Sequence, residues 1–309
     1  MNSLYGKRIA VVGAGAVGCY YGGMLAHAGF DVSFLMRSDR ETVQAEGLHI
    51  HTKGEEVHLF PVSVYASTEE IGPVDLVIIA LKATGNAALE LLIPPLLGPE
   101  TALLTLQNGL GNEEYLAARW GAERVLGALC CVCLNRTAPG VIRPMDQGSI
   151  SVGEYGRPSS PRARAIVDAF NLAGIEARVV EDLAGEHWRK LLWNVPFNGL
   201  AIAAGGVTVA DVLADSGLRA VAQALIEEVR IAAQLLGFEI PESFGKHQIE
   251  RSWSMGPYRP SSLIDWQACR PVEVEAIWGE PWRRGTAAGA SMPRLEMLYR
   301  LLDKVTATQ

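Results

Sequence analysis

The order of apolar and polar positions divides the chain into two parts. In the first part, short apolar runs of strand length alternate with stretches of helical pattern, which is typical of βαβ units and a parallel sheet. The expected strands cover residues 8–12, 31–36, 75–81, 101–107 and 124–133, with an alternating strand at 141–152 that extends the sheet in the antiparallel sense. The expected helices cover residues 17–28 and 162–173.

Between the second and third of these strands the pattern predicts a β-hairpin. Gly47 to Val64 contains two strand-like stretches that flank Thr52-Lys53-Gly54-Glu55. A glycine within a short polar segment between two alternating runs is the usual sign of a tight turn.

From Asp182 onward strands become scarce and helical periodicity dominates. The segments that carry helical signals are residues 183–203, 209–215, 216–236, 241–254, 272–289 and 293–306. We therefore expect an α/β domain over residues 1–180 and a mainly α-helical domain over residues 181–309. A length of 309 residues is sufficient for two domains of ordinary size.

Composition and charge exclude several classes of protein. Apolar residues make up 49% of the chain and charged residues 20%, which is globular composition. A net charge of −7 argues against a nucleic-acid-binding surface. No apolar segment approaches the ~18 residues of a membrane span, and the first residues lack the long apolar region of a signal peptide.

The cysteines indicate a reducing compartment, so we expect a cytoplasmic protein. There are five, an odd number, and three of them crowd together at Cys130, Cys131 and Cys133. This is not a disulfide framework, and the spacing matches no common zinc pattern. We interpret the three as small buried residues of a β-strand and expect no metal site.

A glycine-rich loop, Gly13-Ala14-Gly15-Ala16-Val17-Gly18, follows the first strand and opens the first helix. In this context Gly-x-Gly-x-x-Gly predicts a Rossmann-type dinucleotide site. Gly13 allows the tight turn, Gly15 admits a pyrophosphate to the backbone amides, and Gly18 allows close packing of helix on strand. The helix N-terminus then offers N–H groups to the phosphates.

The end of the second strand favours NADP(H) over NAD(H). NAD-dependent proteins place an acid there to bind the ribose 2′-hydroxyl. Here the chain reads Phe34-Leu35-Met36-Arg37-Ser38, with Asp39 and Arg40 expected in the following loop. Arg37 can receive a 2′-phosphate and Ser38 can add a hydroxyl. The alternative is that Arg37 is a solvated loop charge.

The helix expected at 183–203 carries polar residues on an otherwise apolar surface. Lys190, Asn194 and Asn198 are spaced four apart and share one stripe, while most of their neighbours are apolar. Buried polar groups need partners or a ligand. Pro196 removes one backbone donor and can kink the helix. From spacing alone, a substrate site and a purely structural role stay open.

Taken together, these segments resemble the ketopantoate reductase (2-dehydropantoate 2-reductase) family. Six segments carry the resemblance, in the family's order and over nearly the whole chain: residues 13–18 with Arg37, 80–83, 107–109, 188–199, 261–265 and 270–273. The resemblance implies NADPH-dependent reduction of ketopantoate to pantoate, a step of pantothenate biosynthesis. It also implies a Rossmann domain, a helical substrate domain, and an active site in the cleft between them.

The resemblance also implies roles for individual residues. Lys190 matches the catalytic lysine, and Glu273 matches the glutamate that works with it and binds the substrate hydroxyl. Asn194 and Asn198 match asparagines of the substrate site, and Ser262 matches the serine that holds the substrate carboxylate. Two further residues match positions at the nicotinamide end of the site, Lys82 and Asn108.

Elementary chemistry agrees with these roles. Hydride transfer to a ketone leaves an alkoxide, which needs a proton and a nearby positive charge. A partly buried lysine supplies both. A facing glutamate orients the ammonium, and Asn108 or Asn194 can position the carbonyl. His187 is the rival proton donor, although we expect an exposed histidine at the start of the helix.

The chain departs from the family's pattern in one region. One residue fewer separates Ser262 from Glu273 than is usual, and the next turn reads Glu275-Ala276-Ile277-Trp278-Gly279 rather than acid–aromatic–x–Asn–Gly. Glu275 is therefore an alternative to Glu273. Another 2-oxo acid is an alternative substrate, and a non-catalytic NADP(H) sensor is an alternative function. A helical domain rich in Leu, Ile and Trp is compatible with a homodimer.

Three other patterns are interpreted as structural. His49, His51 and His58 surround the predicted hairpin with no carboxylate arranged with them, so we do not assign them a metal. Glu227, Glu228 and Arg230 are expected on a solvated helix face. Tryptophans in the second part are expected to pack between helices; these are Trp253, Trp266, Trp278 and Trp282.

Overall fold

The computed structural model describes residues 4–52 and 55–307, apart from the side chains of residues 145–147. Backbone contacts divide the chain into two compact units. The first consists of Met1–Gln107 and Asn112–Leu183, and the second consists of Asn108–Gly111 and Ala184–Gln309. The four residues 108–111 therefore leave the first unit and belong structurally to the second.

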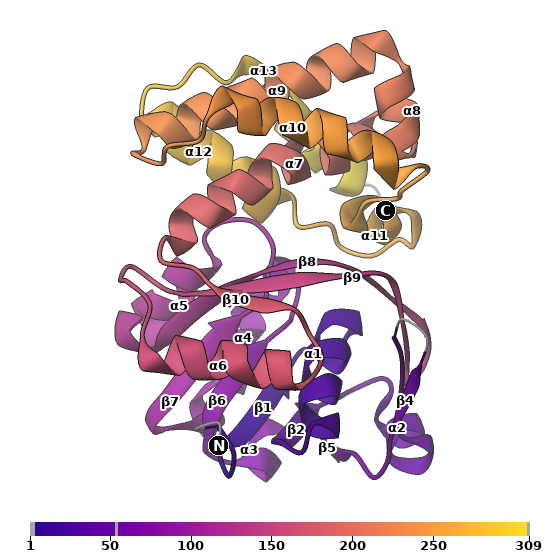
Figure 1. Ribbon diagram of the computed structural model, residues 1–309, viewed down its shortest axis with the longest axis vertical. Helices are drawn as coiled ribbons and strands as arrows, with labels where there is room; N and C mark the ends of the chain where they lie inside the picture. Colours follow the sequence, from indigo (N-terminus) through magenta and orange to yellow (C-terminus); the bar gives the residue numbers. More distant parts are fainter. Residues whose placement is uncertain (1–3, 53–54, 308–309) are drawn as a thin grey trace. The chain divides into compact units, whose positions relative to one another are not determined.

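The first unit is built on one mixed β-sheet (Figure 1). In the described residues the strand order is β4-β3-β9-β8-β7-β6-β1-β2-β5, with β10 paired to β9. The strands are β1 (Arg8–Val12), β2 (Asp31–Leu35), β3 (Leu48–His51), β4 (Glu56–Leu59), β5 (Ser63–Tyr65), β6 (Val74–Ile79), β7 (Leu97–Thr105), β8 (Val125–Ala138), β9 (Val141–Glu154) and β10 (Ala177–Val179).

The predicted parallel sheet and its antiparallel extension are confirmed. Strands β5, β2, β1, β6, β7 and β8 run parallel, and β9 pairs antiparallel with β8. Alternate residues of the central strands enter separate hydrophobic cores: Ile9 and Val11 face one, Ala10 and Val12 the other. Because both faces are covered, these strands are apolar at nearly every position.

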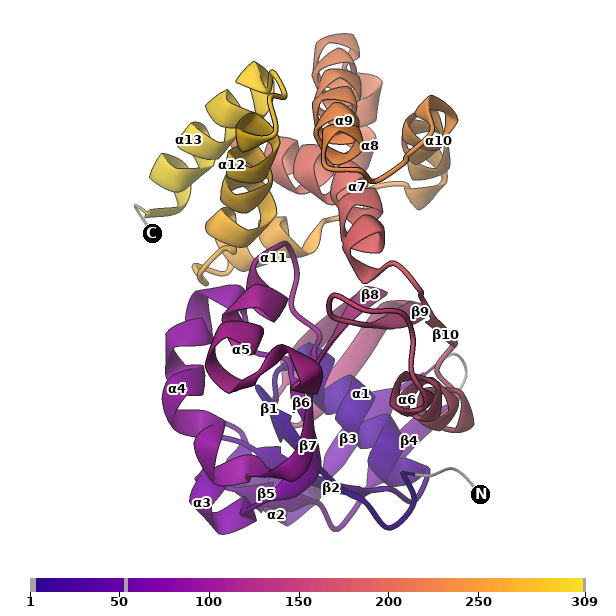
Figure 2. The same cartoon turned by 90° about the vertical axis from the view of Figure 1, so that its left-hand side faces the viewer.

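Helices cover both faces of this sheet, as Figure 2 shows. Helices α1 (Ala16–His27) and α6 (Pro161–Leu172) contribute to the core that contains Ile9, and α3 (Thr68–Ile71) and α5 (Asn112–Trp120) to the opposite core. The remaining short elements of this unit are α2 (Arg40–Glu46), α4 (Leu89–Leu92), and the 3₁₀ helices η1 (Ala83–Ala88), η2 (Pro94–Leu96) and η3 (Ala122–Arg124).

The predicted hairpin is formed by β3 and β4, which pair antiparallel from Leu48↔Leu59 to His51↔Glu56. Its predicted turn includes Lys53 and Gly54, which lie outside the described residues. The hairpin joins β9, whereas β2 and β5, which flank it in sequence, pair with each other. Local pattern does not encode this crossover, because β3 finds its partner about ninety residues further along the chain.

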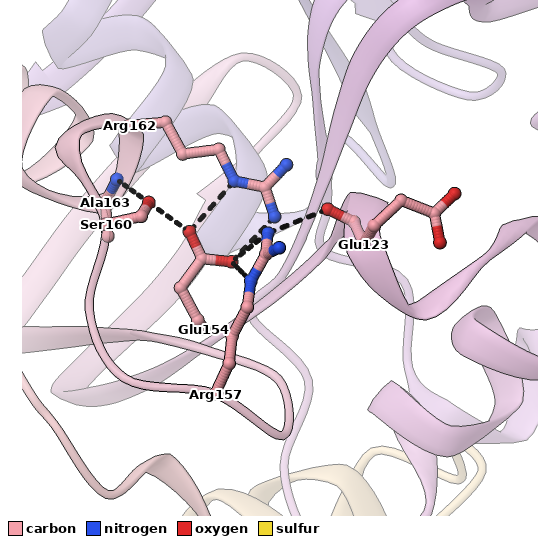
Figure 3. A network of polar contacts seen from close by, with 6 residues as sticks. All are labelled: Glu123, Glu154, Arg157, Ser160, Arg162 and Ala163. Atoms are coloured by element: carbon pink, nitrogen blue, oxygen red, sulfur yellow. Dashed lines mark hydrogen bonds and ion pairs between the residues drawn. The ribbon is translucent and has the colours of Figure 1, made fainter.

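A buried carboxylate joins the end of β9 to the start of α6 (Figure 3). The Glu154 side chain is fully buried, and Arg157 and Arg162 form ion pairs with it at 2.9 and 2.6 Å. Ser160 caps α6 by accepting from Ala163 N–H and also donates its hydroxyl to Glu154. Burial opposes ionisation of Glu154, but these donors outweigh it and lower its pKa.

The second unit is helical, as predicted. Its helices are α7 (Leu183–Ala203), α8 (Val209–Ala214), α9 (Ser216–Leu235), α10 (Glu242–Ser252), α11 (Ser261–Gln267), α12 (Glu280–Ala287) and α13 (Pro293–Ala307), with a 3₁₀ turn η4 (Trp253–Met255) and a π-helical turn η5 (Glu275–Gly279). Helix α7 continues through Pro196, and its residues from Leu191 to Leu200 are all buried. Helix α11 was not predicted, because its seven residues span too few turns to show a period.

Two structural expectations for this unit are wrong. Glu228 is buried rather than solvated: its carboxylate accepts from the backbone N–H groups of Arg294 and Leu295 and so caps α13. Trp253 is 53% exposed, whereas Trp278 is completely buried. A carboxylate on one helix satisfies the free N–H groups of another, which spacing within either helix cannot reveal.

Candidate active site

The glycine-rich loop has the geometry that its three glycines predict. Gly13 has φ +99°, and a Cβ there would lie 2.4 Å from the Leu81 backbone nitrogen, next to the segment that follows β6. A Cβ on Gly18 would lie 2.3 Å from the carbonyl oxygen of Gly13. A side chain at either position would therefore collide with backbone.

Gly15 differs from its neighbours because a Cβ at this position would meet no atom within 4 Å. Gly15 is the N-cap of α1, where no side chain caps the helix and no acidic residue occupies the first turn. The bare helix N-terminus and the open space beside Gly15 are what a pyrophosphate requires. The loop Gly13–Gly18, with Ala14, Ala16 and Val17 between its glycines, thus fits a dinucleotide.

The end of β2 also fits an NADP(H) site. Arg37 is exposed and forms no hydrogen bond or ion pair within the described chain. Ser38 is exposed and donates its hydroxyl to Asp39 at 2.8 Å. Asp39 lies in the bend after β2, as expected, where it is the buried N-cap of α2. The expectation of a loop is wrong for Arg40, which is the first residue of that helix.

A chain of buried and part-buried side-chain hydrogen bonds holds the segments that follow β6 and β7. Thr105 Oγ1 donates to Gln107 Oε1 at 3.0 Å, and Gln107 Nε2 donates to Asn86 Oδ1 at 2.6 Å. Asn86 Nδ2 then donates to Asn112 Oδ1 at 3.1 Å. Lys82 is exposed at the N-cap of η1, in one of these two segments. Sequence reasoning missed Asn86, although polar residues after a buried parallel strand are a signal for such a site.

In the second unit, Lys190 and Asn108 are brought together. The Lys190 ammonium donates a 2.8 Å hydrogen bond to Asn108 Oδ1. Lys190 is half-buried on α7, and Asn108 is half-buried in the 108–111 segment. In this pair the Asn108 side chain accepts through its oxygen, and the ammonium and the amide nitrogen are the donor groups of the two side chains.

The next two residues of the stripe on α7 have different surroundings. Asn198 is buried, and its Oδ1 accepts from the backbone N–H of Ser262 at 3.0 Å, in the first turn of α11. Asn194 is 8% exposed, yet its side chain has no hydrogen-bond partner within the described chain. A buried amide without a partner is costly unless a ligand satisfies it. Asn198 therefore positions Ser262, and Asn194 is the residue that lacks a protein partner.

Burial separates the two candidate glutamates. Glu273 is 5% exposed, whereas Glu275 is exposed and bonds to Arg283 at 2.7 Å and to the Tyr299 hydroxyl. Glu275 is thus part of a surface ion-pair cluster. Glu273 is the buried carboxylate and stays our candidate for the site.

The unusual segment after Glu273 forms the π-helical turn η5. Glu280 N–H bonds to the Glu275 carbonyl, and the next such bond would need the N–H that Pro281 lacks. The freed carbonyl of Ala276 instead accepts from Leu110 N–H at 2.9 Å. Gly109, with φ +83°, packs so closely here that a Cβ would lie 2.3 Å from that oxygen. The π-turn therefore anchors the segment that carries Asn108.

The same turn packs directly against α7. Trp278 Nε1 donates to the Val195 carbonyl at 2.9 Å, and a Cβ on Gly199 would lie 2.9 Å from the same nitrogen. A large buried side chain thus joins η5 to the part of α7 that carries Asn194 and Asn198. The departure from the family's pattern produces a well-packed turn.

Three other expectations need correction. His187 is 6% exposed, not solvated. Of the crowded cysteines on β8, Cys133 is buried but Cys131 is exposed, so only part of that interpretation is right. His49 does have a carboxylate partner, since its Nδ1 lies 2.8 Å from Glu56 Oε1 and its ring stacks on His58.

Comparison with known proteins identifies the family. The family model "Ketopantoate reductase PanE/ApbA" matches residues 9–157, and its C-terminal counterpart matches residues 182–306. The chain belongs to the ketopantoate reductase family. Its 2-dehydropantoate 2-reductase relative from Nostoc sp. is 38% identical over 301 residues, which cover 96% of this chain and 94% of the relative.

Solved structures of the ketopantoate reductase family share the whole fold. The 2-dehydropantoate 2-reductase of Geobacter metallireducens is 40% identical, covers 96% of this chain and 99% of its own, and has a TM-score of 0.93. The one from Methylococcus capsulatus is 31% identical, with coverage of 97% for both chains and a TM-score of 0.90. A D-mandelate dehydrogenase, 24% identical with a TM-score of 0.86, shares the fold.

The resemblance to ketopantoate reductases and the Rossmann-type fold with a helical second part are therefore confirmed. The chain is an oxidoreductase of this family. Among the described residues, no helix combines the length and the apolar character of a membrane span.

Proposed function

We propose that this protein catalyses the NADPH-dependent reduction of 2-dehydropantoate to (R)-pantoate, in pantothenate biosynthesis. The observation that carries the proposal is the hydrogen bond between Lys190 and Asn108 on the same helical unit as the buried, unpartnered Asn194. This unit offers a proton donor, a neutral donor and an unsatisfied amide, which together suit a 2-oxo acid.

The roles follow from the contacts of each residue. When bound, NADPH supplies the hydride for the carbonyl carbon of the substrate. The carbonyl oxygen then gains a negative charge, and the Lys190 ammonium transfers a proton to it, so that the products are a hydroxyl group and a neutral lysine. Asn108, bonded to Lys190 at 2.8 Å, orients the ammonium and donates to the same oxygen.

The substrate's other groups are assigned to the remaining residues. Ser262, buried at the start of α11 and held by Asn198, binds the carboxylate with its hydroxyl. Asn194 bonds to the substrate with its otherwise unpartnered amide. Glu273, buried beyond Ser262, accepts from the substrate hydroxyl and faces the lysine as the resemblance implies.

Cofactor binding is assigned to the first unit. The backbone of Gly13–Gly18 and the N-terminus of α1 bind the pyrophosphate, and the free guanidinium of Arg37 binds the 2′-phosphate. Lys82 and Asn108 lie towards the nicotinamide in this proposal. Arg37 carries the preference for NADPH over NADH.

The test is an assay of purified protein with NADPH and 2-dehydropantoate, in which oxidation of NADPH is monitored by the absorbance of the reduced nicotinamide. We expect saturable oxidation of NADPH and a product that is (R)-pantoate by chromatography. A panel of other 2-oxo acids in the same assay tests the alternative substrate. Preference for another member of the panel would replace 2-dehydropantoate, and no turnover with any of them would refute the proposal.

We also propose that the enzyme acts in the cytoplasm on a small-molecule substrate, as a homodimer without nucleic-acid or membrane partners. The net charge of −7 supports the absence of nucleic-acid partners, since it opposes binding to polyanions. Light scattering during gel filtration measures the oligomeric state, and a mass of 33.3 kDa in solution would refute the dimer.

A further inference from the structure

The first unit contains a carboxylate where an NADP(H) site is least expected to tolerate one. Asp39 lies just beyond β2, next to Arg37 and Ser38. In NAD-dependent proteins an acid near this place binds the ribose 2′-hydroxyl, and the same negative charge repels a 2′-phosphate. The side chain of Asp39 is 9% exposed, so water screens its charge poorly.

An arginine from a distant strand pairs with this carboxylate. Arg136 Nη1 on β8 donates to Asp39 Oδ1 at 2.9 Å, and the Gly140 N–H donates to Asp39 Oδ2 at 3.2 Å. Arg136 also reaches Ser38 Oγ, at 3.4 Å. The two charged residues are 97 positions apart in sequence, so that only the tertiary structure pairs them.

The pair lies close to the glycine-rich loop. Cys19, which directly follows Gly18, contacts the Ala14 carbonyl through its Sγ at 3.2 Å. Its pKa is raised to about 12, first by burial and then by the charge of Asp39, and Arg136 counteracts part of this effect. Both charges therefore act at the start of α1, where the dinucleotide is proposed to bind.

The orientation of the hydrogen bonds leaves Arg37 free. Asp39 accepts from Arg136, Ser38 and the backbone of Gly140, and it makes no bond to Arg37. If Arg136 were absent, Arg37 and Arg40 would be the cations nearest in sequence to Asp39. Arg136 thus neutralises the carboxylate, and the guanidinium that the 2′-phosphate needs is not bonded to it.

We propose that Arg136 supports the preference for NADPH that Arg37 carries, by neutralising Asp39. The inference rests on the proposed use of NADPH and deepens it. Arg136 is a positioning residue in this proposal: it acts on the 2′-phosphate through Asp39 and Ser38. Without it, Asp39 repels the phosphate, competes for Arg37, and is able to accept from the 2′-hydroxyl of NADH.

The test measures direct binding of NADPH and of NADH to the full chain. Binding is monitored by nucleotide fluorescence in the absence of substrate. We expect Arg136→Gln to reduce the preference for NADPH, expressed as the ratio of the two Kd values, by about tenfold. Arg136→Lys retains the charge and most of the preference. Arg143→Gln removes an exposed arginine from the opposite face of the same β8–β9 hairpin and leaves the ratio unchanged.

A double variant separates neutralisation from direct contact with the phosphate. In Arg136→Gln/Asp39→Asn the repelling carboxylate is gone, and we expect the ratio to return to within about threefold of the wild type. If Asp39→Asn does not restore the ratio of the two Kd values, the proposal is overturned. An equal loss of affinity for NADPH and for NADH in Arg136→Gln would also overturn it. Because this double variant has no unpaired charge, it also keeps the test decisive if Arg136→Gln alone does not fold.

The wild-type control distinguishes this inference from the proposed function. If the wild type shows no preference for NADPH, the assigned cofactor is wrong. If the wild type prefers NADPH and Arg136→Gln prefers it equally, the cofactor stands and the role of Arg136 is refuted.

Discussion

The Lys190 ammonium donates a 2.8 Å hydrogen bond to the side-chain oxygen of Asn108, a residue that precedes it by 82 positions. Asn108 belongs to a four-residue segment that the chain inserts into its helical unit. The proposed acid is therefore oriented by a residue from outside its own helix. This relationship is the basis of the first two predictions.

Replacing Lys190 removes the proposed proton donor. We expect Lys190→Met to lower kcat by about 10²–10⁴-fold, the usual contribution of a positioned acid, while the Kd for NADPH stays near the wild-type value. Steady-state kinetics and fluorescence titration measure the two quantities. Lys304→Met, at a lysine on α13 whose side chain is 84% exposed, is the control and should retain full activity. Full turnover in Lys190→Met would show that another residue, such as His187, donates the proton.

Adding a methyl group at Gly109 should displace Asn108. Gly109→Ala places a Cβ 2.3 Å from the Ala276 carbonyl oxygen, so the segment must shift away from η5. We expect kcat to fall by at least about tenfold, because misplacement by about an ångström is costly to catalysis. The matched control is Gly111→Ala, which has a similar φ of +94° but a nearest contact of 3.5 Å. Equal losses of activity in both variants would mean that backbone strain alone, and not displacement of Asn108, lowers kcat.

Substitutions of Asn194 and Asn198 should affect different properties, substrate binding for the first and stability for the second. Asn198→Leu leaves the buried Ser262 N–H without its acceptor and should lower the free energy of unfolding by about 1–3 kcal/mol. Asn194→Leu removes an amide that has no protein partner, so thermal stability should be maintained while KM rises. Thermal unfolding and kinetics of both variants provide the comparison. A large loss of stability in Asn194→Leu would contradict its assignment to the substrate.

The buried Glu154 predicts a loss of stability in acid. Its pKa is lower in the folded state than in the unfolded state, where it lies near 4.5. The contribution of Glu154 to the free energy of unfolding is therefore complete above pH 4.5, and it disappears as the pH falls through the lower folded-state pKa. Glu154→Gln should therefore cost about 2 kcal/mol at pH 7 and progressively less below pH 4.5. Tm measured across pH tests this, with the exposed Glu176→Gln as control. A Tm difference that does not depend on pH would assign the effect to packing.

Much of the architecture could be predicted because it depends on local periodicity. The strand before Gly13, the glycine loop and the helix 183–203 all follow from short-range patterns, and the structure confirms each of them. Predictions were weakest for short elements and for charges. Helix α11 spans seven residues, and Glu228 looks like an ordinary surface residue until α13 packs over it.

The sequence by itself determined the dinucleotide loop, the presence of an arginine rather than an acid beyond β2 at Arg37, and the polar stripe on α7, because each lies within a single element and its flanks. Only the tertiary structure decided which of these residues have partners. It paired Lys190 with Asn108, Ser262 with Asn198, and Arg136 with Asp39. The physical reason is that hydrogen bonds and ion pairs depend on distances of about 3 Å, and a separation of sixty to one hundred residues becomes such a distance only when the chain packs.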